Sequence, residues 1–274
     1  MPSDMSPDPS SAVVSLLPAQ RRQRIVEFLR RHGAVTLTQL EQALGVSIST
    51  LRRDLDALAA DGEVDRTHGG ALLRHQGYSA FEPDARAASE LSPREKQAIG
   101  TVAAAALEPR QSVIFDSGST VLEAAHAAVR RAIPLTAVTN DLAIAQVLGA
   151  SPLVQVHVLG GVLRPASTTL IGEGLLESAR AIHADVLLCG AHAITEGTLT
   201  ETSLEVAAVK RALMKAASAR RLLIDGSKFR PRTFMQVSSV SEFDEVITDD
   251  GAPAEELERL RALGPKVIVA ARSA

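Results

Sequence analysis

The chain of 274 residues has little that could crosslink it, stack on bases or hold it in a membrane. Its single cysteine, Cys189, excludes an intrachain disulfide and favours a reducing cytoplasm as its setting. We interpret Cys189 as a small buried strand residue rather than a reactive thiol. The absence of tryptophan and an aromatic share of 3% argue against a stacking platform for single-stranded nucleic acid. No apolar run approaches the length of a membrane span, so we expect no membrane partner.

The sequence also lacks the motifs of common catalytic and metal sites. Its 7 histidines form no HxxxH or HExxH set, and with a single cysteine a zinc site is not expected. The phosphate-binding motif GxxxxGK[ST] is absent, which argues against nucleotide hydrolysis. We therefore predict no catalytic residues, no metal and no cofactor.

Charge gives no global signal, since the net charge is only −3. Between residues 18 and 75 the arginines slightly outnumber the acidic residues, so nucleic-acid binding would depend on a local, salt-sensitive patch. Residues 1–15 have neither a basic start nor an apolar run, so they do not resemble a signal peptide. We expect this region to be a disordered tail.

The most informative stretch of the chain is residues 45–75. After Gly45 the sequence predicts a helix with one apolar stripe. Ser47 stands at the N-cap, where its hydroxyl is expected to accept a backbone N–H. The opposite side carries two hydroxyl residues and then Arg52 and Arg53, in the half of a recognition helix that reaches base edges and phosphates. This pattern predicts a helix that binds DNA in the major groove.

The flanking residues complete a winged helix-turn-helix. Residues 21–33 and 36–45 each predict a helix with one apolar side, and a tight turn joins the second of them to the arginine-bearing helix. Residues 62–71 predict a short strand, a turn and a glycine pair, as in a wing that lies against the DNA backbone or the minor groove. The alternative is a three-helix packing module with a solvated face. The residues predicted to contact DNA are Ser47, Ser49, Thr50, Arg52, Arg53, Arg66 and His68.

After this region the chain alternates β-rich runs with helical stretches. Such alternation predicts an α/β domain with a mostly parallel sheet that helices cover on both faces. The predicted strands are residues 112–116, 135–140, 154–160, 185–190, 221–225, 245–249 and 266–270, and the helices between them are 119–132, 142–150, 203–218 and 253–264. The predicted organisation is a disordered tail (1–17), a winged helix-turn-helix (18–73), a linker (74–91) and the α/β domain (92–274).

Polar and small residues follow these strands, at the edge where ligands of parallel sheets bind. The turn Asp116–Thr120 directs backbone N–H groups, hydroxyls and a helix N-terminus at one point, which suits an oxyanion. Lys228 offers a point charge to a phosphate, and neighbouring carboxylates and Asn140 can hold sugar hydroxyls. An ordinary strand-to-helix turn, and turn or cap chemistry at Asp225, are the alternatives. Lys210 stands on an amphipathic helix, where a solvated position is the default.

Separated motifs along the chain resemble the DeoR family of bacterial transcriptional regulators in order and spacing. In the first domain they are VSISTLRRDL (46–55) and RTHGGA (66–71). In the second they are SPREKQAIG (92–100), DSGST (116–120), TND (139–141), LGG (159–161), VKRALM (209–214) and DGSKF (225–229). The resemblance covers nearly the whole chain after residue 18, and only ITEGTLTETS (194–203) looks like an insertion.

The resemblance implies an effector-sensing domain that is similar to the ribose-5-phosphate isomerase and coenzyme A transferase-like fold. It implies a cytoplasmic repressor of carbohydrate-metabolism genes, nucleoid-associated when bound, that leaves its double-stranded operator DNA when a phosphorylated sugar binds. A homodimer or homotetramer is expected. The predicted effector ligands are Asp116, Ser117, Gly118, Ser119, Thr120, Asn140, Asp141, Gly160, Gly161, Gly190, Lys210, Asp225 and Lys228.

The alternative is an enzyme, either a sugar-phosphate isomerase or an acyl-transfer relative with a DNA-binding appendage. Its acid–base groups would be Asp116, Asp225, Glu201 and Glu205, with Lys210 or Lys228 stabilising an enolate. No spacing in the sequence pairs these groups at a known catalytic geometry. His192 stands at a strand end, from which it could contact a ligand.

Overall fold

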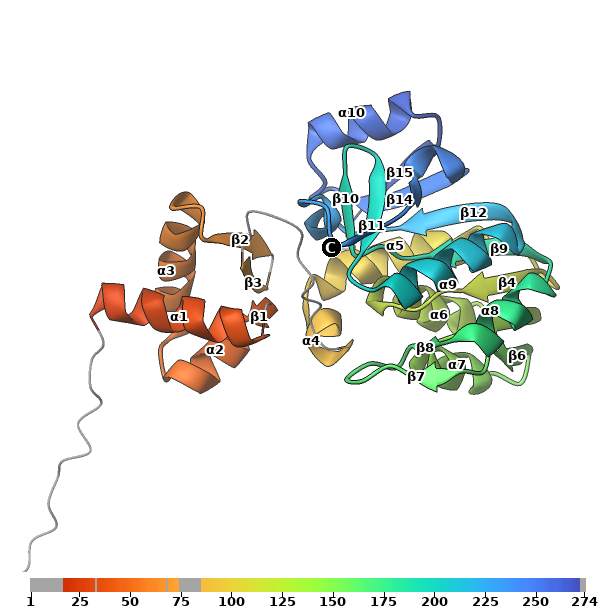
Figure 1. Cartoon of the computed structure of the whole chain (residues 1–274), viewed down its shortest axis with the longest axis horizontal. Helices are drawn as coiled ribbons and strands as arrows, with labels where there is room; N and C mark the ends of the chain where they lie inside the picture. The colour runs from red at the N-terminus through yellow and green to blue at the C-terminus, as the bar shows by residue number, and fades with distance from the viewer. Residues whose placement is uncertain (1–16, 33, 68, 74–84, 272–274) are drawn as a thin grey trace, which may run out of the picture.

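The computed structural model describes residues 17–32, 34–67, 69–73 and 85–271. The N-terminal part has three helices and a three-stranded antiparallel sheet of order β1-β3-β2 (Figure 1). All of the predicted tail except residue 17, and most of the predicted linker, lie outside the described residues. The elements are α1 (Pro18–His32), β1 (Ala34–Thr36), α2 (Leu37–Leu44), α3 (Ile48–Ala60), β2 (Val64–Thr67) and β3 (Gly70–Leu73).

Apolar residues from all three helices form the core of this part. Ile25 of α1, Leu40 of α2 and Leu51 of α3 are fully buried together. A partly buried ion pair between Arg21 and Asp54 joins α1 to α3, with Arg21 Nη2 3.0 Å from Asp54 Oδ1. These contacts hold α3 so that its apolar stripe faces inward, as its sequence predicts.

The second strand of the wing, β3, packs so closely against β1 that glycine is required at its first residue. A Cβ on Gly70 would lie only 1.9 Å from the carbonyl oxygen of Val35, because β1 and β3 pair directly there. Any side chain at this position would push β3 away from β1. The glycine in this wing therefore permits the close approach of two strands.

A seven-stranded parallel sheet of order β15-β14-β12-β9-β4-β5-β6 forms the centre of the C-terminal part. Each of the seven strands predicted from sequence is one of its members. Their bounds are β4 (Ser112–Phe115), β5 (Leu135–Thr139), β6 (Val154–Val158), β9 (Ala184–Cys189), β12 (Ala217–Leu223), β14 (Glu245–Asp249) and β15 (Lys266–Ala270).

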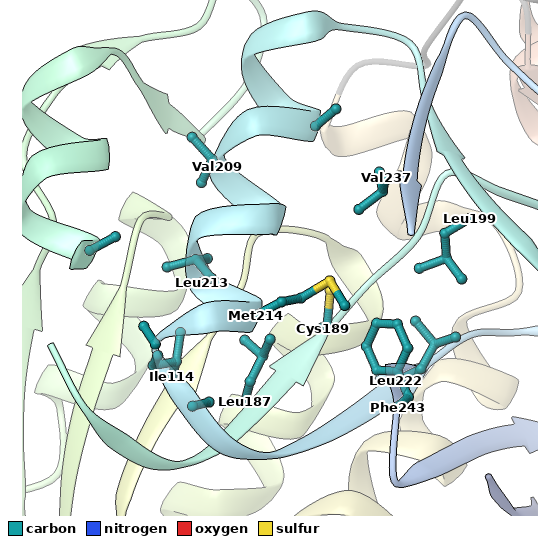
Figure 2. Packing of buried hydrophobic residues seen from close by; sticks show 14 of the residues in the cluster. Ile114, Leu187, Cys189, Leu199, Val209, Leu213, Met214, Leu222, Val237 and Phe243 are labelled. Carbon is teal, nitrogen blue, oxygen red and sulfur yellow. The ribbon is translucent and has the colours of Figure 1, made fainter. Parts of the chain in front are cut away.

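Helices cover both faces of this sheet, because alternate residues of the central strands are apolar on each side. Val113 and Phe115 of β4 pack on one helical layer, whereas Ile114 between them packs on the other. Figure 2 shows the apolar cluster that contains Ile114, in which Ile114 and Cys189 of the sheet face Leu213 of the covering helix. The first layer is α5 (Pro93–Ala105), α6 (Ser119–Arg130) and α7 (Leu142–Gly149), and the second includes α8 (Glu173–Arg180), α9 (Leu204–Lys215) and α10 (Ala254–Ala262).

Several shorter elements were not expected from the sequence. The predicted linker contains a helix, α4 (Ala85–Glu90), which contacts both β1 and α6 (Figure 1). The segment 194–203, which looks like an insertion, forms most of a hairpin in a second sheet of order β10-β11-β13. The remaining elements are β7 (Val162–Leu163), β8 (Leu170–Ile171), β10 (Ala193–Thr195), β11 (Thr198–Glu201), η1 (Gly226–Lys228), β13 (Met235–Ser239) and η2 (Val240–Glu242).

Candidate functional site

The exposed face of α3 carries hydroxyl groups and two arginines side by side. Ser49, Arg52 and Arg53 are exposed and Thr50 is partly buried. Arg53 bends back along the helix, with its Nε 3.4 Å from the carbonyl oxygen of Ser49. This arrangement presents two guanidinium groups and two hydroxyls to solvent on the N-terminal half of the helix.

Ser47 does not cap the helix in the way expected. Its side chain makes no capping hydrogen bond, and its Oγ instead lies 3.2 Å from Ser49 Oγ and 3.1 Å from Thr50 Oγ1. The hydroxyl therefore belongs to a polar cluster on the exposed side of α3. The predicted N-cap position is confirmed, but the predicted capping hydrogen bond is absent because neighbouring hydroxyls engage the same oxygen.

The wing contributes one described cation, Arg66. Its Nε pairs with Asp56 Oδ1 of α3 at 3.0 Å, and its Nη1 lies 3.4 Å from the carbonyl oxygen of Gly70. Arg66 is thus held between α3 and the wing, with part of its charge engaged inside the domain. His68, also predicted to contact DNA, lies outside the described residues.

In the α/β part, a cavity of about 650 Å³, counted with its open mouth, lies at the carboxyl ends of the parallel strands. It is lined by residues from several strand ends, from α9 and from α4. Seven of the residues predicted as effector ligands are among them. The lining residues are Ala88, Ser117, Gly118, Ser119, Thr120, Arg164, Thr169, Gly190, Ala191, His192, Glu201, Val206, Lys210 and Lys228.

The N-terminus of α6 opens into this cavity without a side-chain cap. Gly118 occupies the N-cap position at a φ of 127°, a conformation that other residues rarely adopt. The first N–H groups of α6 therefore have no capping side chain, and the buried Ser117 and Thr120 stand beside them. An uncapped helix N-terminus with adjacent hydroxyls is suited to binding an anion.

Lys210 is fully engaged by the protein itself. Its Nζ forms a buried ion pair with Asp116, lies 3.0 Å from the Gly190 carbonyl oxygen and lies 3.5 Å from Glu201 Oε1. Two of its N–H donors bond to Asp116 and to the Gly190 carbonyl oxygen, and Glu201 adds a second negative charge nearby. Burial works to lower the pKa of Lys210, but the two carboxylates outweigh it and raise the pKa. Lys210 stays charged and ties three strand ends to α9.

Asp116, which pairs with Lys210, also links two strands of the sheet. Its Oδ2 also accepts the N–H of Gly190 at 3.1 Å, which joins the ends of β4 and β9. Asp116 is 0% exposed and does not line the cavity, so its side chain lies behind the wall rather than in it. Burial and the Asp116 carboxylate raise the pKa of the nearby Cys189 thiol, which keeps the buried cysteine protonated and unreactive.

Lys228 and Asp225 stand together where β12 ends. The buried Asp225 accepts the Ser227 N–H at 3.0 Å and so begins the short helix η1, which ends at Lys228 in the cavity wall. Burial works to raise the pKa of Asp225, but Lys228 and Lys96 outweigh it and lower the pKa. The carboxylate is thereby a fixed negative charge that faces two lysines.

Asn140, Asp141 and the glycine pair do not line the cavity. Asp141 Oδ1 caps α7 through the N–H groups of residues 143 and 144, and its Oδ2 accepts the Thr168 hydroxyl at 2.9 Å. Asn140 donates its side-chain N–H to the carbonyl oxygen of Leu170 at 3.2 Å. Both residues thus anchor the hairpin that carries Arg164 and Thr169. Their role as effector ligands, like that of Gly160 and Gly161, remains a prediction.

Some lining residues had no signal in the sequence. Arg164 and Thr169 lie in the β7–β8 hairpin, which follows no periodic pattern, and Ala88 lies on the unexpected helix α4. His192 lines the cavity, in line with the expectation that it could contact a ligand from its strand end. Glu201 was expected only as a possible acid–base group of an enzyme.

Among the described residues, no group of three or more histidine, cysteine, aspartate or glutamate side chains could hold a metal ion. Within the same ranges, no helix combines the length and apolar character needed to cross a membrane.

Both parts of the chain match domains of one known family. The DeoR-like helix-turn-helix domain matches residues 21–77, and the DeoR C terminal sensor domain matches residues 92–250. The HTH-type transcriptional repressor GlcR of Bacillus subtilis is 33% identical, over 84% of this chain and 88% of its own. The glycerol-3-phosphate regulon repressor of Escherichia coli is 29% identical, over 88% of this chain and 94% of its own.

Solved structures resemble the fold at low identity. Ribose 5-phosphate isomerase A from Neisseria gonorrhoeae is 14% identical over 50% of this chain and 53% of its own, with a TM-score of 0.37. The translation initiation factor eIF-2B of Pyrococcus horikoshii is 15% identical over 80% of this chain and 70% of its own, with a TM-score of 0.43. At these scores the resemblance has no bearing on function.

A winged helix-turn-helix with an arginine-bearing third helix, followed by an α/β domain with a polar cavity, defines a ligand-responsive transcriptional regulator. The sequence motifs and the two matched domains indicate the same family of regulators. The chain belongs to the DeoR family.

Proposed function

We propose that this protein represses carbohydrate-metabolism genes and leaves its operator when a phosphorylated sugar occupies the cavity of the α/β domain. The observation that carries this proposal is the uncapped N-terminus of α6, which shares the cavity with Lys228. The names of the relatives support it, since one of them is the repressor of a glycerol-3-phosphate regulon. The repressor would act in the cytoplasm as a homodimer or homotetramer, because operators are commonly two-fold symmetric.

The first experiment is a fluorescence-anisotropy titration of the protein against DNA from its own promoter region. The titration is repeated at rising salt and with a panel of phosphorylated sugars, while product formation is followed in parallel. Salt-sensitive binding that one sugar phosphate relieves without turnover is the expected result. An absence of specific DNA binding would contradict the proposal.

The DNA side of the proposal rests on the exposed face of α3. We predict that Arg53→Ala weakens operator binding by about 1–3 kcal/mol, because its guanidinium would bind a base edge or a phosphate. The matched control is Arg180→Ala, which removes an exposed arginine from α8 of the other domain. Operator affinity that is unchanged in Arg53→Ala would remove this residue from the DNA-binding face.

We also propose that the protein is not an enzyme. Two of the four carboxylates named as possible acid–base groups, Asp116 and Glu201, contact the buried Lys210. A carboxylate whose contacts hold a buried ammonium group suits a structural role better than proton transfer. Conversion of any sugar phosphate in the panel would favour the enzyme hypothesis instead.

The helix α4 is the element that we propose to couple the two sites. Its Ala88 lines the cavity, and the Lys96 ammonium holds its C-terminal end by donating to the carbonyl oxygens of Ala88 and Leu91 at 2.5 and 2.6 Å. The same helix contacts β1 of the winged domain, and Gln39 of α2 donates to Glu90 at 3.4 Å. An effector that displaces α4 would therefore act on the DNA-binding part through direct contacts.

A charge removed from α4 should weaken this coupling. We predict that Glu90→Ala leaves the operator affinity and the effector affinity each within about twofold, but reduces the effector-induced loss of operator affinity by about 0.5–2 kcal/mol. Glu177→Ala, on the exposed side of α8, is the control. Anisotropy with and without effector measures the difference. A full response in Glu90→Ala would show that the coupling takes another route.

A further inference from the structure

His192 stands at the carboxyl end of the central strand β9, in the wall of the cavity. Its backbone is fixed on both sides. The His192 N–H donates to Glu201 Oε1 at 3.2 Å, and its carbonyl oxygen accepts Arg230 Nε at 3.0 Å and Nη2 at 2.6 Å. These bonds hold the backbone of His192 in the cavity wall, so the fold and not the ligand sets the point from which its side chain starts.

The imidazole ring of His192 has no hydrogen-bond partner among the described residues. His192 is only 8% exposed, and its hydrogen bonds within the described parts of the chain all belong to its backbone. The ring nitrogens are not among the buried polar atoms that have no partner, so they stay open to the cavity and available to a ligand. Because the residue lines an open cavity, a molecule in that cavity is the available partner.

The charge state of the ring indicates what this partner is. Burial lowers the pKa of His192 well below its ordinary value, and four cations add to the effect, namely Arg230, Lys228, Lys210 and Arg164. A neutral imidazole offers one N–H donor and one acceptor nitrogen. A hydroxyl group, which both donates and accepts, complements such a ring, whereas a phosphate oxygen is better served by the lysine and the helix N-terminus.

We infer that His192 binds a hydroxyl group of the effector, beside the phosphate, and so helps to decide which phosphorylated sugar the protein accepts. The inference depends on the proposed function, because it assumes that the cavity holds a phosphorylated polyol. It assigns the two ends of the effector to different parts of the wall. Lys228 and α6 hold the phosphate, and His192 discriminates among the carbon chains attached to it.

Calorimetric titration of the full-length protein measures separately how tightly it binds the phosphate and the carbon chain of the effector. The probes are inorganic phosphate, glycerol 3-phosphate, glucose 6-phosphate and fructose 6-phosphate. We expect His192→Ala to weaken the best-bound sugar phosphate by about tenfold or more and inorganic phosphate by less than about threefold. His192→Gln, which keeps a donor and an acceptor, should retain part of the affinity or change the order of preference among the probes.

His183→Ala is the matched control, because His183 precedes the same strand at its opposite end and is exposed. An equal loss for inorganic phosphate and the sugar phosphate would overturn the inference, as would no loss for either. If the wild-type protein binds the sugar phosphates but His192→Ala gives either of these two outcomes, the proposed function stands and only the role of His192 is lost. If no probe binds the wild-type protein, both are overturned.

Nitrogen NMR of the imidazole rings gives a second test that does not depend on affinity. The His192 signals are assigned by their absence in His192→Gln, whose fold is checked by circular dichroism. We expect a neutral ring at pH 7 in the free protein, and a ring that stays neutral but shifts on addition of the best-bound sugar phosphate. A ring that becomes protonated on binding would show contact with an anionic group and would overturn the hydroxyl assignment.

Discussion

Replacing Lys210 with methionine is expected to lower the free energy of unfolding of the α/β domain by about 3–5 kcal/mol. The substitution preserves most of the side-chain volume but removes the ammonium group that pairs with Asp116 and Glu201. The buried Asp116 carboxylate would then lose its ion-pair partner, Glu201 would lose its contact with the ammonium, and the Gly190 carbonyl oxygen would lose a donor. The cost arises from the groups left behind rather than from the lysine itself.

Urea denaturation followed by circular dichroism measures this effect, with the transition of the α/β domain fitted separately from that of the winged domain. Lys215→Met is the control, because Lys215 is exposed on the same helix and its loss should change stability by no more than about 0.5 kcal/mol. The double variant Asp116→Asn with Lys210→Met should recover part of the loss. A cost below about 1 kcal/mol for Lys210→Met would contradict the buried-cluster account.

The parallel sheet could be predicted almost completely because its strands are buried on both faces. Such strands contain continuous Val, Ile and Leu runs, as in residues 112–116 and 185–190, and a helical pattern separates each from the next. The short elements could not be predicted in this way. The hairpin of β7 and β8 and the helix α4 are too short for a periodic pattern, and tertiary contacts decide their conformation.

The candidate site was predictable where the signal was a strand end. Ser117–Thr120 and Lys228 follow strands directly, and the parallel topology brings them into one cavity. The same signal at Asp141 gave no indication that its carboxylate caps α7 and holds Thr168. Lys210 stands on an amphipathic helix, and its burial depends on Asp116, a residue 94 positions away, which no local pattern reveals.

Lys228→Ala should abolish the response to the effector and leave operator binding intact. Lys228 lies in the cavity wall, close to the uncapped N-terminus of α6, where its ammonium would bind the phosphate of the effector. Loss of a charge-assisted hydrogen bond costs about 1.5–3 kcal/mol, which corresponds to an effector affinity roughly 10 to 150 times weaker. An effector concentration that releases the wild-type protein would then leave the variant on its operator.

Operator binding should be unaffected because Lys228 ends η1 in the α/β domain, whereas the predicted DNA contacts lie on α3 and the wing. Anisotropy of labelled operator, measured with increasing effector, gives both quantities in one experiment. Lys266→Ala, which removes an exposed lysine of the edge strand β15, is the control and should respond like the wild-type protein. Lys228→Arg keeps the positive charge and should recover part of the response. An unaltered response in Lys228→Ala would place the phosphate elsewhere in the cavity, whereas loss of operator binding would show that Lys228 supports the fold on which both sites depend.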